Sequence, residues 1–67
     1  MATFAEANRV RMGLKMKFSN YAWYNWSTVS SNKNSYVVLI NVSRIDNHIR
    51  KIIPPVVEGV EVKTEIE

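Results

Sequence analysis

The chain has 67 residues, of which 46% are hydrophobic, and it carries a formal net charge of +3. A chain of this length forms a single small domain, residues 1–67, that buries only about 60% of its unfolded surface. It contains no cysteine and one histidine, His48, so disulfides are excluded and a structural zinc site is not expected. We therefore predict no metal and no cofactor, and we expect a homo-oligomer or a subunit of a larger assembly.

Hydropathy predicts no membrane segment. The apolar runs are shorter than the ~20 residues that a membrane-spanning helix requires. The first residues also lack the apolar core of a secretory signal peptide. We expect no membrane partner and a cytoplasmic location, in the organism itself or in an infected host cell.

Charged residues are divided unevenly along the chain. Residues 9–51 contain eight of the nine Lys and Arg residues and one acid, Asp46, whereas residues 52–67 contain four Glu and one Lys. This asymmetry predicts either a polyanionic partner or neighbouring copies that meet basic face to acidic tail.

The first segment is predicted to begin as a helix. Thr3 and Glu6 have the spacing of a capping box, and Gly13 suits the position just past a helix end. A strand is the alternative, because apolar and mostly basic residues alternate between positions 9 and 18. We predict a helix over 4–12 followed by a strand over 14–18.

The next segment is rich in aromatic and β-branched residues. It contains both tryptophans and all three tyrosines, and an Asn/Ser-rich stretch divides it. β-branched and aromatic residues suit a pleated, half-buried surface, and Asn and Ser favour turns. We predict a hairpin with strands over 21–30 and 35–43. In the second strand the predicted core face is Tyr36, Val38, Ile40 and Val42.

The last third is predicted to contain one helical turn and one strand. Asp46 or Asn47 would cap a turn through residues 49–52, which Pro54 and Pro55 would end. After a turn at Gly59, apolar and charged residues alternate over 60–66, the pattern of a half-buried strand.

These elements predict an α+β fold, with an N-terminal helix on a small, mainly antiparallel sheet of about four strands. A small Sm-like or SH3-like barrel is the variant. Strands 14–18 and 60–66 are the expected edges, and unpaired edges favour association with further copies.

The residues do not assemble a catalytic centre. Asp46 and His48 are an acid and a base two positions apart, but residues at this spacing do not face each other on a helix. With two glycines the chain has no phosphate-cradling glycine loop. We predict that the protein is not an enzyme and has no small-molecule substrate.

Aromatic and basic residues together predict a nucleic-acid site. Proteins that bind single strands stack bases on exposed aromatic side chains and contact phosphates through Lys and Arg. The alternative is that Trp23 and Trp26 simply form the core, because each tryptophan buries a large area. The candidate binding residues are Arg9, Arg11, Lys15, Lys17, Trp23, Tyr24, Trp26, Arg44, His48, Arg50 and Lys51.

Three pieces of the chain resemble the Hfq branch of the Sm-like family. They are Phe4, Ala7 and Arg9 in the first helix, the strand 36–40, and the segment 47–54. The chain has Asn-His-Ile where that branch has Lys-His-Ala, and it extends beyond the match over 56–67. The resemblance implies a ring oligomer that binds RNA, with His48, Arg50 and Lys51 at its pore.

The predicted function is therefore a small, oligomeric, non-enzymatic protein that contacts single-stranded RNA or DNA through a basic, aromatic-bearing sheet. The alternative is an assembly subunit, or a small virus-encoded inhibitor of another protein, with no role in nucleic-acid binding.

Overall fold

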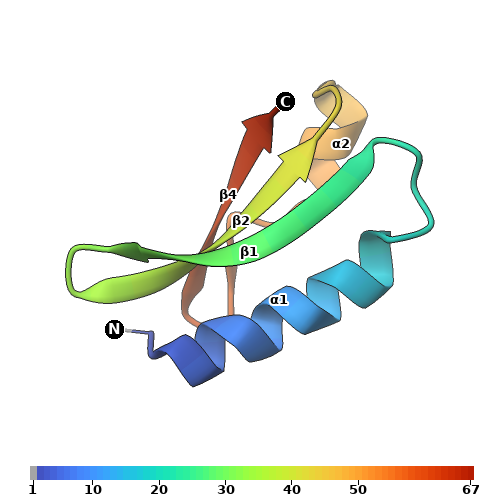
Figure 1. Ribbon diagram of the computed structural model, residues 1–67. Helices are drawn as coiled ribbons and strands as arrows, with labels where there is room; N and C mark the ends of the chain where they lie inside the picture. Colours follow the sequence, from blue (N-terminus) through green and yellow to red (C-terminus); the bar gives the residue numbers. More distant parts are fainter. Residues whose placement is uncertain (1) are drawn as a thin grey trace.

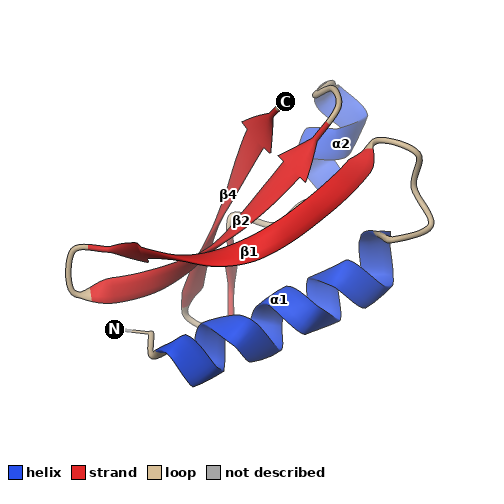
Figure 2. Ribbon diagram, in the orientation of Figure 1, coloured by secondary structure: helices blue, strands red, loops and turns tan. Residues whose placement is uncertain are grey.

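A computed structural model describes residues 2–67, apart from the side chain of Asn32. One long helix, α1 (Phe4–Phe18), lies against a four-stranded sheet, and a short helix, α2 (Asn47–Ile52), lies near one end of it (Figures 1 and 2). The predicted α+β fold is confirmed. The strands are β1 (Tyr24–Asn32), β2 (Ser35–Val42), β3 (Val56–Val57) and β4 (Val60–Ile66).

The sheet is open and mixed, with the strand order β1-β2-β4-β3. The β1/β2 and β3/β4 pairs are antiparallel, whereas β2 and β4 run parallel from Val38↔Val62 to Val42↔Ile66. A parallel pair needs a crossover connection, and α2 lies in that connection. The chain thus adopts the predicted helix-on-sheet arrangement rather than the barrel variant.

The predicted strand over 14–18 is wrong, because α1 continues to Phe18. Ala7, Val10, Leu14 and Phe18 recur at helical spacing and are all buried, so they form one continuous apolar stripe. A strand would have placed Met16 beside them, but this side chain is 79% exposed. A glycine inside a helix costs only about 1 kcal/mol relative to alanine, which is too little to end a helix with a buried stripe.

The start of α1 is fixed by the predicted capping box. The Glu6 amide donates to Thr3 Oγ1 at 3.2 Å, and the Thr3 amide donates to Glu6 Oε1 at 2.9 Å. Hydrogen bonding of the Glu6 carboxylate with the Thr3 backbone, and then with the Thr3 side chain, lowers the pKa of this carboxyl below its ordinary value. The carboxylate is therefore held in its charged form beside the positive end of the helix.

The core lies between α1 and the sheet. Val38, Ile40 and Val42 are fully buried on the helix-facing side of β2, as predicted, and Phe18 is fully buried against them. Tyr36 differs from its three predicted partners because it is 38% exposed, at the end of the sheet where its ring meets Phe4 edge-on.

Strand β1 begins at Tyr24 rather than at residue 21, and an irregularity follows its first residue. The register shifts between Tyr24 and Trp26, so that Asn25 is an extra residue in this strand. A single extra residue reverses the side-chain alternation that follows. Tyr24 therefore faces α1, whereas Trp26 lies on the other face of the sheet; uninterrupted alternation would have placed both on the same face.

The last third follows the prediction closely but not completely. Asp46 caps α2 by accepting a hydrogen bond from the Ile49 amide at 2.9 Å. Gly59, with φ +80°, lies in the tight turn that joins β3 to β4. In β4, Val60 and Val62 are buried as expected, but the second half of the strand is exposed on both faces.

Neither helix of the described chain is long and apolar enough to cross a membrane. Within residues 2–67, no group of three or more His, Asp or Glu side chains is placed to hold a metal ion.

Replacing Gly13 with alanine tests the continuous helix. An added Cβ at Gly13 would meet no other atom within 4 Å, so we expect Gly13→Ala to stabilise the fold by about 0.8–1 kcal/mol and raise Tm by about 4–8 °C. Thermal unfolding followed by circular dichroism measures the change. Gly59→Ala is the control and should be destabilising, because its φ of +80° disfavours a side chain. A loss of stability in Gly13→Ala would mean that the helix ends at this residue.

Candidate functional site

A shallow trough runs between α1 and the outer edge of β1. It consists of two hollows of about 220 and 200 Å³ that share Arg11 and Ser27 as lining residues. The first is otherwise lined by Phe4, Asn8, Thr28 and Val29, and the second by Lys15, Tyr24, Asn25 and Trp26. Because β1 is an edge strand, its outward backbone N–H and C=O groups border the trough.

The helical wall of the trough follows from the repeat of α1. Phe4, Asn8, Arg11 and Lys15 are spaced by three or four residues, so they share one flank of the helix, beside the buried stripe. The Arg11 Nε–H donates to Asn8 Oδ1 at 3.0 Å, which restrains the guanidinium in the trough. Arg11 is half-buried and Lys15 is exposed, so both cations reach solvent from this wall.

The strand wall supplies aromatic and polar groups. Trp26 is 45% exposed, which makes it the more accessible of the two tryptophans. Tyr24 is half-buried, and its hydroxyl lies 2.9 Å from Ser27 Oγ. The hydroxyl groups of Tyr24 and Ser27 therefore face the two cations of α1, whereas Trp26 borders the second hollow from the other face of the sheet.

The trough is electropositive. Each residue that lines the two hollows is neutral or basic. A guanidinium binds phosphate or carboxylate oxygens through paired N–H donors, and an ammonium adds a mobile point charge. An exposed indole offers a face for stacking. The arrangement is therefore suited to an extended anion that also carries planar rings.

Two predicted site residues of α1 lie outside this trough. Arg9 and Lys17 line a separate hollow on the opposite flank of the helix, together with Pro54, Val57 and Glu58. Lys17 Nζ also lies 5.7 Å from the centroid of the Phe18 ring. The structure thus divides the four cations of α1 into two pairs.

Trp23, another predicted site residue, belongs to the core. It is only 5% exposed, and its ring packs against Tyr21 at 5.0 Å and Phe18 at 5.7 Å between centroids. The core interpretation is therefore correct for Trp23, while Trp26 remains available at the surface.

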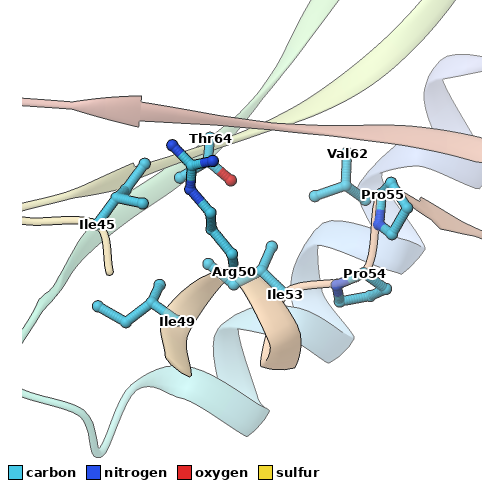
Figure 3. Close-up of a pocket in the computed structure, with 8 residues that line it drawn as sticks. All are labelled: Ile45, Ile49, Arg50, Ile53, Pro54, Pro55, Val62 and Thr64. Atoms are coloured by element: carbon cyan, nitrogen blue, oxygen red, sulfur yellow. The ribbon is translucent and has the colours of Figure 1, made fainter. Parts of the chain in front are cut away.

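The remaining predicted residues, Arg44, His48, Arg50 and Lys51, lie on α2 or just before it, and all four are exposed. Arg50 lines an apolar hollow of about 260 Å³ between α2 and β4 and extends toward Thr64 (Figure 3). These residues form a second basic region, which shares no lining residue with the trough.

The sheet face opposite α1 is not the basic surface that the sequence suggested. On β4 it carries Glu61, Lys63 and Glu65, by the alternation of the strand. Asn41, at the centre of this face, is only 4% exposed. Its Oδ1 accepts a hydrogen bond from Asn25 Nδ2 at 2.8 Å, and its Nδ2 donates one to Glu65 Oε1 at 3.3 Å. These side chains link β1, β2 and β4, and the basic residues of the candidate site lie on α1 instead.

Sequence reasoning missed Phe4, Asn8 and the Ser27–Thr28 pair as trough residues. The signal was present, because Phe4, Asn8, Arg11 and Lys15 have helical spacing. It becomes visible only when the helix is continued past Gly13.

No protein-family model matches the chain, and comparisons with curated proteins and with solved structures find no match. The resemblance to Sm-like proteins therefore stays a prediction.

The different environments of the two tryptophans can be tested by fluorescence quenching. A variant that retains only Trp26 (Trp23→Phe) should emit at longer wavelength and be quenched steeply by iodide, because the ring is 45% exposed. A variant that retains only Trp23 (Trp26→Phe) should emit at shorter wavelength and resist quenching, because the ring is 5% exposed. Equal quenching of the two variants would contradict the placement of Trp23 in the core.

Proposed function

We propose that this protein is a non-enzymatic binding protein that holds a segment of single-stranded nucleic acid in the trough between α1 and β1. In this proposal Arg11 and Lys15 contact phosphates, and Trp26 stacks on a base. The observation that carries it is that Arg11, Lys15 and the exposed Trp26 all line one hollow of the trough, which has no acidic lining residue.

The trough favours a single strand over a duplex. Stacking on Trp26 requires a base whose face is free, which a paired and stacked duplex does not offer. Base–aromatic stacking contributes about 1–3 kcal/mol per base and tolerates any base, so we expect weak sequence preference.

The polar groups of the strand wall complete the proposed site. The Ser27 hydroxyl, which lies on the α1 side of β1 next to the Tyr24 hydroxyl, can donate to a phosphate or sugar oxygen. Ser27 and Arg11 line both hollows, so together they would guide the backbone of the bound strand from one hollow to the other.

A pair of charge-neutralising variants tests this site. Arg11→Gln/Lys15→Gln should bind an oligonucleotide of unpaired bases more weakly, and its salt dependence should flatten. Loss of two phosphate contacts on a single strand lowers the slope of log K against log salt by about 1.4. The measurement is a titration followed by fluorescence anisotropy of a labelled oligonucleotide at several salt concentrations.

The matched control is Arg9→Gln/Lys17→Gln. It removes the same charge from the same helix, but on the flank that faces away from the trough. We expect it to retain most of the wild-type slope. If both double variants reduce the slope equally, binding is general attraction to a basic protein and the trough is not the site. If neither variant changes it, the proposed function is wrong.

A further inference from the structure

The second half of β4 presents an unpaired edge. Strand β3 pairs with β4 only at Val60 and Glu61, while β2 pairs with β4 from Val62 to Ile66 on the opposite side. Beyond Val62, therefore, one side of β4 has no neighbouring strand among the described residues. An exposed edge of this kind is a template for pairing with another chain.

The hydrogen-bond pattern identifies the free groups on this edge. The Val62 amide donates to the Pro55 carbonyl at 2.8 Å on the β3 side, whereas the Glu67 amide donates to the Val42 carbonyl at 2.9 Å on the β2 side. Successive residues of a strand point their backbone N–H and C=O groups to opposite sides. The N–H and C=O groups of Thr64 and Ile66 therefore point to the open side, as those of Val62 do. Pro55 has no N–H, so it cannot donate to the Val62 carbonyl.

An apolar hollow opens beside this edge, on the α2 side of the sheet. It has a volume of about 260 Å³ and is lined by Ile45, Ile49, Ile53, Pro54, Pro55 and Val62, with Arg50 and Thr64 beside them (Figure 3). Ile66 lies on the same face of β4 and is 57% exposed. This edge of β4 thus combines an apolar hollow with an exposed apolar side chain, that of Ile66.

We propose that a second copy of this chain occupies the edge, with its β4 antiparallel to the first and the two-fold axis at Thr64. Thr64 of each copy then exchanges both backbone hydrogen bonds with Thr64 of the other. Because Pro55 holds the position beside Val62, the paired segment runs from Lys63 to Glu65, and the strand of the second copy leaves the ladder at Ile66. The sheets of the two copies become continuous through this pair of strands.

Side chains on both faces fit this register. On the α2 face, Ile66 of each copy leaves the ladder beside Pro55 of the other, at the mouth of the apolar hollow. On the other face, Lys63 lies opposite Glu65 of the second copy, twice by symmetry. If the two-fold axis lay at Glu65 instead, the two Glu65 side chains would lie opposite each other and repel. The charges therefore select the register centred on Thr64.

Thr64→Pro tests the backbone contacts. The Thr64 amide points away from β2, so proline at this position removes an edge donor without removing a β2 bond. We expect wild-type chains to reach twice the 7.7 kDa chain mass in a concentration series by sedimentation, and Thr64→Pro to remain monomeric. Circular dichroism should show an unchanged fold.

A charge-reversal cycle tests the register independently of proline. Lys63→Glu and Glu65→Lys should each raise the dissociation constant of the dimer about tenfold, because each places like charges opposite one another twice. The double variant Lys63→Glu/Glu65→Lys restores opposite charges and should recover most of the affinity. Glu61→Lys makes the same change on the same face outside the paired segment, so it should have little effect. Glu65→Gln controls for the hydrogen bond to Asn41.

Three results would overturn the proposal. One is a wild-type chain that stays monomeric at every concentration, which would leave the edge to a strand from a different protein. Another is a Thr64→Pro dimer as tight as wild type, which would place the interface elsewhere. The third is a double charge variant no tighter than the single ones. Each readout is a mass, so it is independent of nucleic-acid binding in the trough.

Discussion

The structure depends on burial of the apolar stripe of α1 against β2. Phe18, Val38, Ile40 and Val42 are each fully buried at this contact, in a domain too small to have a second core. Truncating a buried phenylalanine costs about 3–5 kcal/mol, which is comparable to the whole stability that a domain of this size has. This contact fixes the rotation of α1 about its axis, and with it the direction of each charged side chain on the helix.

Once that rotation is fixed, the surface follows from the helical repeat. The flank that carries Arg11 and Lys15 faces the outer edge of β1, and the flank that carries Arg9 and Lys17 faces away from it. The extra residue at Asn25 then turns Trp26 to the exposed side of the sheet while Tyr24 packs toward the helix. The core contact and the helical repeat thus place Arg11 and Lys15 beside Tyr24 and Ser27, and the strand irregularity places Trp26 on the other face of the same edge strand.

Much of this fold was predictable from local chemistry, namely the Thr3–Glu6 cap, the strands over 35–43 and 60–66, and the Asp46 cap. The end of α1 was not, because alternation of apolar and basic residues over 9–18 satisfies a strand as well as a helix, and only the tertiary burial of Leu14 and Phe18 decides between them. The sheet face on which Trp26 lies could not be predicted either, since no residue type marks the extra position in β1. Of the candidate site, Arg11, Lys15, Tyr24 and Trp26 were identified, but their grouping required the rotation of the helix.

The most direct test of the trough is a map of amide chemical shifts during titration with an oligonucleotide of unpaired bases. Our account predicts that the largest changes fall on one flank of α1, at Asn8, Arg11 and Lys15, and on β1 from Tyr24 to Val29. Residues of α2 and β4 should change little. The largest changes at His48, Arg50 and Lys51 would contradict it and would place binding at the second basic region, where the Sm-like resemblance expects it.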